Sequence, residues 1–229
     1  MDAQKTLSRM LGFNAGYVDT AGFLALGGLF TAHVTGNFVT LGASLVHHGS
    51  EGALSKLAAL PVFCAAVVLS RMASNALVAR QRPPLYSLVV AKILLLVLAA
   101  ALMIGFGPFR NADAPLAFVA GMSMVCAMAV QNAMHRMHLS QLPPSTLMTG
   151  NTTQVMLDLA DLLKNVQGEA RSAALARLRK MVPSILYFAS GCALAALAYL
   201  WLGMWCFALP PVLALLSLNW LPAAGVSTA

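Results

Sequence analysis

The sequence His33-Val34-Thr35-Gly36-Asn37 follows the first long apolar run of the chain, and Met148-Thr149-Gly150-Asn151 follows the fourth. The two Thr-Gly-Asn copies are offset by 114 residues, and the similarity continues into the residues that follow them. Asn37, Thr40, Ser44 and His47 in the first copy correspond to Asn151, Gln154, Asp158 and Asp161 in the second. Steps of three, four and three residues place each set on one face of a helix. The pattern indicates two related halves, each arranged around one Thr-Gly-Asn.

The composition is that of an integral membrane protein. Of the 229 residues, 59% are hydrophobic and 9% are charged, and the mean hydropathy is +0.78, whereas soluble proteins average about 25% charged residues. The 14 Lys and Arg residues exceed the 7 Asp and Glu residues, which is typical of basic loops held on the cytoplasmic side of a membrane. No basic stretch is interleaved with aromatic residues, so we expect the lipid bilayer as a partner and no nucleic acid.

Six apolar segments are candidate membrane-spanning helices, since about 20 residues are needed to cross a hydrocarbon core about 30 Å thick. They cover residues 11 to 31, 57 to 79, 84 to 106, 115 to 137, 181 to 203 and 205 to 221. Because Asp19 interrupts the first segment and no A-x-A-like cleavage site follows it, we expect a retained helix. The positive-inside rule predicts that the N-terminus and the C-terminus are both cytoplasmic.

The segments that begin at the two Thr-Gly-Asn copies, residues 36 to 48 and 150 to 165, are too short and too polar to span a membrane. We interpret them as half-helices or interfacial helices. With three spans in each half, the second half crosses the bilayer in the opposite direction to the first. The sequence therefore predicts one all-α polytopic membrane domain over residues 1–229, built from two inverted repeats, 10–107 and 115–222, as in many transporters.

Thr, Gly and Asn each suit the start of a helix. The threonine can act as an N-cap acceptor, the glycine allows a turn where a side chain would clash, and the asparagine can satisfy freed backbone groups. Two interpretations follow. Either the two half-helix N-termini point toward a shared site, or the segments are well-capped interfacial helices that a gene duplication repeated.

Further motifs carry a resemblance to a known family. They are Ala15-Gly16-Tyr17-Val18-Asp19-Thr20-Ala21-Gly22, the residues from Phe30 to Asn37, the triplet Gln131-Asn132-Ala133, and the second Thr-Gly-Asn. Together they resemble the YoaK family of bacterial multi-pass membrane proteins, over nearly the whole chain. The resemblance implies a six-span protein of the bacterial inner membrane, and it supplies no catalytic residue to carry over.

Three ionisable residues lie at similar depth in the first half. Asp19 is about ten residues into the first segment, or about 15 Å deep, and Arg71 and Lys92 lie about nine residues from the cytoplasmic ends of their own segments. An unpaired charge at the centre of a membrane helix costs about 2.5 to 3.5 kcal/mol, so we expect Asp19 to pair with Arg71 or Lys92. Two bases against one acid would favour an anionic solute. Alternatively, both bases extend to the inner headgroups while Asp19 bonds to backbone.

Small residues predict close helix contacts. Gly12 and Gly16 form a GxxxG motif, and Ala66, Ser70 and Ser74 repeat at four-residue spacing, so the first and second segments should each pack closely against a neighbour. Met122, Met124, Met128, Met134 and Met137 enrich the fourth segment, where we expect them to fill the core.

The sequence offers no enzyme signature. It contains no H-E-x-x-H, P-loop or dinucleotide motif, and its four cysteines lie in apolar runs without a C-x-x-C pair. His47-His48 has no acidic or cysteine partner at a suitable spacing for a metal. We therefore predict no catalytic residue, no cofactor and no metal site.

We predict an inner-membrane transporter or channel for a small solute, and the charges of the first half favour an anion as this solute. Its path would be lined or shaped by Asp19, Arg71, Lys92, His33, Thr35, Gly36, Asn37, Gln131, Asn132, Thr149, Gly150 and Asn151. The alternative is a non-transporting membrane scaffold or accessory subunit in which these residues cap and join helices, and a membrane-embedded enzyme comes third. The identity of the solute and assembly into a homo-oligomer are left open by the sequence.

Overall fold

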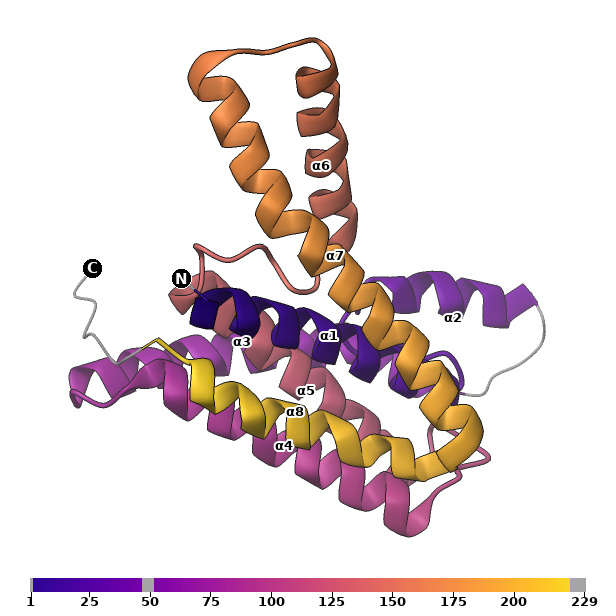
Figure 1. Cartoon of the computed structure of the whole chain (residues 1–229). Coiled ribbons are helices and arrows are strands. Elements are labelled where there is room, and N and C mark those ends of the chain that lie inside the picture. The colour runs from indigo at the N-terminus through magenta and orange to yellow at the C-terminus, as the bar shows by residue number, and fades with distance from the viewer. Residues whose placement is uncertain (1, 47–51, 223–229) are drawn as a thin grey trace.

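A computed structural model describes residues 2–46 and 52–222 of the chain (Figure 1). The elements are α1 (Asp2–Ala25), α2 (Gly36–Val46), α3 (Ala53–Ala79), α4 (Pro84–Phe106), α5 (Pro115–His138), α6 (Met148–Leu163), α7 (Gly168–Leu202), η1 (Gly203–Ala208), α8 (Leu209–Ser217) and η2 (Leu218–Trp220). No strand occurs within these residues, which confirms the predicted all-α fold. Both short helices that begin near Thr-Gly-Asn are present. His47 and His48, including the end of the first polar stripe, lie outside the described residues.

Within the described residues, four helical segments are long and apolar enough to cross a membrane, by length and composition. They are Ala53–Ala79, Pro84–Phe106, Pro115–His138 and Gly168–Trp220. The last includes both of the apolar segments that we predicted near the C-terminus, because residues 168–220 form an almost unbroken helical stretch. Four such segments indicate a multi-pass helical membrane protein.

Helix α1 is a central element that other helices enclose. Almost every residue from Leu11 to Ala21 is buried, and its polar residues Ser8, Asn14 and Asp19 are at most 7% exposed. Polar residues of a membrane protein are tolerated where they face other helices, whereas a surface that faces lipid must be apolar. This explains why α1 carries more polar residues than the helices around it.

The first predicted segment, residues 11 to 31, was placed too far along the chain. The helix begins at Asp2 and ends at Ala25, because Gly27 and Gly28 adopt positive φ angles of 59° and 84° that a helix does not allow. The chain then folds back along α1 as a loop over residues 26–35. This reversal brings His33 beside Asp19.

The hydrophilic connection that we predicted over residues 168 to 180 is helical, and it forms the first part of α7. Figure 1 shows α6 and this part of α7 as a hairpin that projects from the rest of the molecule. The polar stripe of α6 faces α7, where Asp158 accepts three hydrogen bonds from Arg177, the shortest 2.6 Å, and a fourth from Gln154. The hydrogen bonds from Arg177 hold the pKa of the Asp158 carboxyl below its usual range.

Helices α1 and α7 approach closely at two glycines. A Cβ atom on Gly16 would lie 2.2 Å from the carbonyl oxygen of Phe188, and one on Gly191 would lie 2.1 Å from that of Phe13. The GxxxG motif of α1 is thus a contact within one chain. The predicted small-residue ladder of α3 is likewise a contact, because Ser70 and Ser74 are buried and the hydroxyl of Ser74 lies 3.0 Å from Nε2 of His138 on α5.

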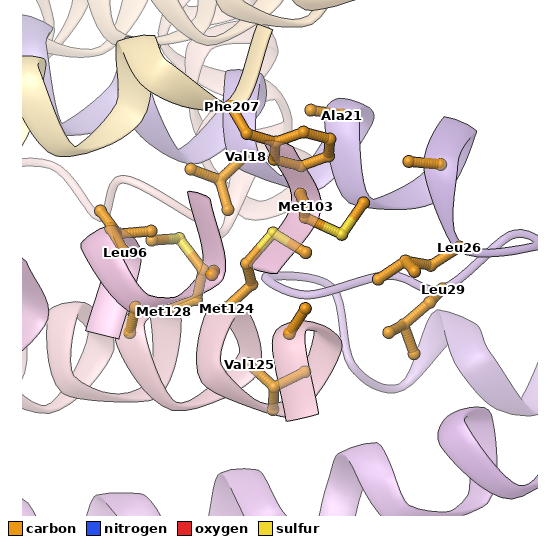
Figure 2. Close-up of a cluster of buried hydrophobic side chains, with 14 of the residues drawn as sticks. Val18, Ala21, Leu26, Leu29, Leu96, Met103, Met124, Val125, Met128 and Phe207 are labelled. Atoms are coloured by element: carbon orange, nitrogen blue, oxygen red, sulfur yellow. The ribbon is translucent and has the colours of Figure 1, made fainter. Parts of the chain in front are cut away.

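The core is apolar and rich in methionine, as Figure 2 shows for side chains from α1, α4, α5, η1 and the loop after α1. Met124, Met128 and Met134 are at most 1% exposed, so the methionines of α5 fill the core as predicted. At Gly203, whose φ is 54°, the chain turns from α7 into η1 and α8. Leu218 and Trp220 then pack against the cluster that contains Leu7 and Leu11, so η2 lies at the same end of the molecule as the start of α1.

Candidate functional site

Asp19 holds the loop that precedes α2. Its Oδ1 accepts hydrogen bonds from the backbone N–H groups of Thr31 and Ala32, both 2.7 Å long, and a longer one from that of His33. Its Oδ2 lies 2.6 Å from Nδ1 of His33. A carboxylate that receives several N–H groups is strongly stabilised, so a 5% exposed Asp19 is tolerated in this helix.

The expected pairing of Asp19 with Arg71 or Lys92 is wrong. The partner is His33, which the chain reversal at Gly27 and Gly28 delivers. The hydrogen bond to Asp19 raises the pKa of His33 above its usual value, although partial burial acts in the opposite direction. His33 also meets the ring of Phe188 edge to face, with centroids 5.5 Å apart, so this pair borders α7.

The asparagines of the two Thr-Gly-Asn copies make the same side-chain to backbone hydrogen bond in both halves. Nδ2 of Asn37 donates to the carbonyl oxygen of Phe30 at 2.8 Å, and Nδ2 of Asn151 donates to that of Pro144 at 2.9 Å, in each case seven residues upstream. Oδ1 of Asn37 also accepts the N–H of Phe30, a bond for which Pro144 has no donor. The predicted role of asparagine in satisfying freed backbone groups is borne out by these bonds.

A second anchor holds the loop that precedes α6. Gln131 on α5 donates through Nε2 to the hydroxyl of Ser145 at 2.9 Å and to the carbonyl oxygen of Leu11 at 3.0 Å. The neighbouring Asn132 accepts a 2.6 Å hydrogen bond from the hydroxyl of Thr146. At the repeat offset, Ser145 corresponds to Thr31, the residue that Asp19 holds in the first half. Each short helix therefore follows a loop that a polar side chain of the preceding long helix fixes.

Lys92 is buried in α4 with a neutral partner. Its side chain is 1% exposed, and Nζ donates to Oε1 of Gln131 at 2.5 Å. No carboxylate lies within ion-pair distance of Lys92 in the part of the chain that the structure describes. The predicted extension of Lys92 to the headgroups is wrong, since its side chain is enclosed by protein.

Lys92, Gln131 and Asn14 form a polar layer between two apolar clusters. One cluster includes Leu11, Val89 and Met134, and the other includes Val18, Leu96 and Met128. Asn14 and Lys92 lie between the two clusters along α1 and α4, and Gln131 follows Val130 at the edge of the first cluster along α5. Asn14 is 1% exposed, and neither polar atom of its side chain has a hydrogen-bond partner among the described residues. Unpaired buried polar groups are rare, so this layer is the candidate site for a small polar ligand.

The remaining predicted residues are less enclosed. Arg71 is exposed on α3, and Thr35, Thr149 and Gly150 are exposed at the starts of the short helices. The predicted N-cap role fails for Thr149, because α6 begins at Met148 and its N-cap, Leu147, makes no side-chain capping bond. The structure thus groups Asp19 with His33, and Lys92 with Gln131, at two places rather than in one layer.

The two glycines of the repeat are not equivalent. A Cβ atom on Gly36 would lie 2.9 Å from the ring of Phe30, whereas one on Gly150 would meet nothing within 4 Å. The predicted steric need for glycine therefore holds at the first copy only.

Sequence reasoning missed Asn14, Ser145 and Thr146 as members of the site. A polar residue inside an apolar stretch was the available signal for Asn14, and the repeat offset could have paired Ser145 with Thr31. Within residues 2–46 and 52–222, no three His, Cys, Asp or Glu side chains are grouped so that they could hold a metal ion.

The helices and the enclosed polar residues define a multi-pass integral membrane protein. The chain belongs to the family described as "Protein of unknown function (DUF1275)", which it matches over residues 7–220. It is 28% identical over 166 residues to the UPF0700 transmembrane protein YoaK of Bacillus subtilis (strain 168), an alignment that covers 72% of this chain and 68% of that protein. The resemblance to the YoaK family is therefore confirmed. No solved structure matches the chain.

Proposed function

We propose that the protein is an inner-membrane transporter or channel for a small, anionic solute. The observation that carries this proposal is the buried Lys92, which has a neutral amide as its partner and no carboxylate within reach among the described residues. A buried ammonium is unfavourable in an apolar surrounding unless an anion or water accompanies it. An anionic solute that passes this layer would supply the missing charge, and the unpaired amide of Asn14 would supply a further hydrogen bond.

The proposed topology is six passes in two inverted repeats, with α1, α3 and α4 in the first half and α5, α7 and the η1 to η2 segment in the second. The matched bonds of Asn37 and Asn151 support a common origin for the two halves. The packing of Leu218 and Trp220 against the cluster that contains Leu7 supports termini on one side, which the positive-inside rule assigns to the cytoplasm.

In this proposal the loops anchored by Asp19 and Gln131 border the path from opposite sides of the membrane. Thr35 and Thr149, which are exposed at the starts of α2 and α6, would face the solute's route. Gly36, Gly150, Asn37, Asn151 and Asn132 would shape the backbone there, His33 would position the first loop, and Arg71 would contribute charge near the inner surface.

A flux screen in proteoliposomes tests the proposal. Small anions and neutral metabolites are loaded in turn, and the wild-type chain is compared with Lys92→Met and with Lys180→Met, a control at an exposed lysine of α7. We expect anion flux that Lys92→Met reduces at least tenfold and that the control retains. Absence of flux for every anion, or equal flux in both variants, would reject the proposal.

A membrane scaffold is the second candidate, because the hydrogen bonds of Asp19 and Asn37 join protein segments to one another. Single cysteines at Thr35 and Thr149 distinguish the two functions, in a background in which Cys64, Cys126, Cys192 and Cys206 are replaced. Labelling by water-soluble thiol reagents from opposite sides, slowed by a transported anion, supports a path. Labelling that no solute changes supports a scaffold.

A further inference from the structure

A cavity of about 120 Å³ lies where α5 ends and the loop before α6 begins. It is well above the roughly 10 to 15 Å³ that admits one water molecule. Its polar lining is contributed by Asn132, His135, Arg136, Ser140, Ser145 and Thr146. Of these six residues, Asn132 alone was among the predicted site residues.

Arg136 supplies a permanent positive charge to this cavity. It is exposed and has no ion-pair partner in the described part of the chain. A guanidinium presents parallel N–H groups that match two oxygens of a carboxylate or phosphate. The charge of the cavity therefore favours an oxyanion.

His135 supplies an acceptor that has no partner. The residue is 6% exposed, and its Nε2 lies 3.1 Å from the carbonyl oxygen of Leu142. Since a carbonyl can only accept, Nε2 carries the hydrogen in the neutral ring, and Nδ1 holds a lone pair. Nδ1 is buried and has no hydrogen-bond partner among the described residues. Because His135 lines the cavity, a small shift of its ring would open Nδ1 to a ligand that donates an O–H.

Ser145 adds a donor and connects the cavity to the polar layer. Its hydroxyl oxygen accepts the hydrogen bond from Gln131, so its own hydrogen is available to a ligand. Gln131 in turn accepts from Lys92. The hydroxyl of Thr146 is already used by Asn132. A ligand bound to Ser145 would thus be connected to the buried lysine through two hydrogen-bonded residues, Ser145 and Gln131.

We propose that this cavity binds a small oxyanion that still carries an O–H group. The anionic oxygens are bound by Arg136 and Ser145, and the O–H is donated to Nδ1 of His135. Hydrogen phosphate has this chemistry, and so has the phosphomonoester headgroup of phosphatidic acid. The inference deepens the proposed function by naming a ligand class, and it rests on that function only for the direction in which the anion moves.

The test measures binding of inorganic phosphate and of sulfate to the purified full-length chain by isothermal titration calorimetry at pH 7. Sulfate has the same shape but no O–H at this pH, and a site built to accept a ligand hydrogen rejects an analogue that lacks it. We expect phosphate to bind at least tenfold more tightly than sulfate. No phosphate binding at millimolar concentration, or equal affinities for the two anions, would overturn the proposal.

Three variants locate the binding. Arg136→Gln, at an exposed position, should weaken the binding of both anions at least tenfold. Arg80→Gln, at the exposed arginine that follows α3, should change the affinity for neither anion. His135→Gln keeps an amide donor for Leu142 but removes Nδ1, so it should abolish the preference for phosphate over sulfate. Phosphate binding that Arg136→Gln leaves unchanged would overturn the assignment.

A second set of binding measurements, in lipid nanodiscs, identifies the source of the phosphate group. In nanodiscs that contain phosphatidic acid, loss of phosphate binding relative to phosphatidylcholine nanodiscs would assign the cavity to the lipid headgroup, and retained binding would assign it to a free anion. The calorimetry needs no flux. Binding without flux would therefore reject the transport proposal alone, and flux without selective binding would reject this cavity alone.

Discussion

Nζ of Lys92 on α4 donates a hydrogen bond to Oε1 of Gln131 on α5, and both side chains are at most 1% exposed. The amide nitrogen of Gln131 donates onward to the backbone of α1 and to the loop before α6. One glutamine therefore links three helices to the second Thr-Gly-Asn segment. The buried lysine and the repeated motif are parts of one hydrogen-bonded unit.

This unit predicts an asymmetry between two substitutions. Gln131→Leu leaves the buried amine of Lys92 without a partner, and we expect it to lower the free energy of unfolding by about 2 to 3 kcal/mol. Lys92→Met removes the charge together with its desolvation penalty and keeps the length of the side chain, so we expect a change under about 1.5 kcal/mol. Unfolding of the purified variants in detergent, followed by circular dichroism, measures both. Equal losses would show that the amine finds another partner.

The asparagines of the two Thr-Gly-Asn copies predict a second pair of substitutions with unequal effects on stability. Asn37→Ala would leave both the N–H and the carbonyl of Phe30 without this partner, whereas Asn151→Ala would affect only the carbonyl of Pro144. Each unsatisfied buried group costs about 1 to 3 kcal/mol. We expect Asn37→Ala to lower the midpoint of thermal unfolding in detergent more than Asn151→Ala does. The reverse order would contradict the idea that the second backbone bond of Asn37 sets the difference.

The sequence predicted the apolar helices well where prolines and uninterrupted apolar runs define them. The segment 84 to 106 matches α4 at both ends, and 115 to 137 matches α5 within one residue. Pro84 and Pro115 begin these helices because a first-turn residue needs no N–H bond. The two short helices were also predicted, from the matched polar stripes that follow Thr-Gly-Asn.

The partners of the buried polar side chains were not predictable from depth alone. Depth counting placed Asp19 beside Arg71 and Lys92, but it could not foresee that Gly27 and Gly28 turn the chain back along α1. That turn supplies Asp19 with backbone N–H groups and with His33, which satisfy it without any base from another helix. Likewise, Asp158 of the second stripe faces Arg177, because residues 168–180 continue α7 instead of forming a loop.

The crossing of α1 and α7 predicts a strong penalty for any added side chain. Gly16→Ala or Gly191→Ala would place a methyl group within 2.2 Å of a backbone oxygen, so the helices must separate. We expect losses of about 1 to 3 kcal/mol from overpacking. Gly105→Ala is the control, because a Cβ atom at Gly105 in α4 meets nothing within 4 Å. Thermal unfolding of the three variants in detergent tests the contact, and a destabilised control would count against it.

Gly36 and Gly150 have different surroundings, so a comparison of their alanine variants distinguishes a structural role from a functional one. Gly36→Ala should destabilise the protein, because its methyl group would press on the ring of Phe30. Gly150→Ala should leave the unfolding midpoint unchanged or raise it, because this helical position has open space for a methyl group. Any loss of anion flux in Gly150→Ala would then reflect the path itself. Measuring the midpoint and the flux of both variants makes this comparison, and a destabilised Gly150→Ala would show that the space at this position is needed for folding.

The pair of Asp19 and His33 predicts that the loop before α2 loosens as pH rises. Hydrogen bonding to Asp19 raises the pKa of His33 above the ordinary value of about 6.5. A group whose pKa is raised by folding stabilises the folded state fully below its unfolded pKa, and this contribution is lost as pH rises through the folded pKa. The charged pair is therefore intact in mildly acidic solution and weakens above about pH 6.5. Asp19 is the ionisable group that hydrogen-bonds to His33, and Phe30 and Phe188 border its ring.

A ratio of labelling rates measures this opening. Thr35→Cys reports on the loop that His33 holds, and Thr149→Cys reports on the equivalent loop, which Gln131 and Asn132 hold without an ionisable group. Since both cysteines ionise with pH, the ratio of their rates cancels the chemistry of the thiol. We expect the ratio of Thr35→Cys to Thr149→Cys labelling to rise from pH 6 to pH 9, and His33→Gln to remove the rise. A flat ratio in the presence of His33 would mean that the backbone bonds to Asp19 alone hold the loop closed.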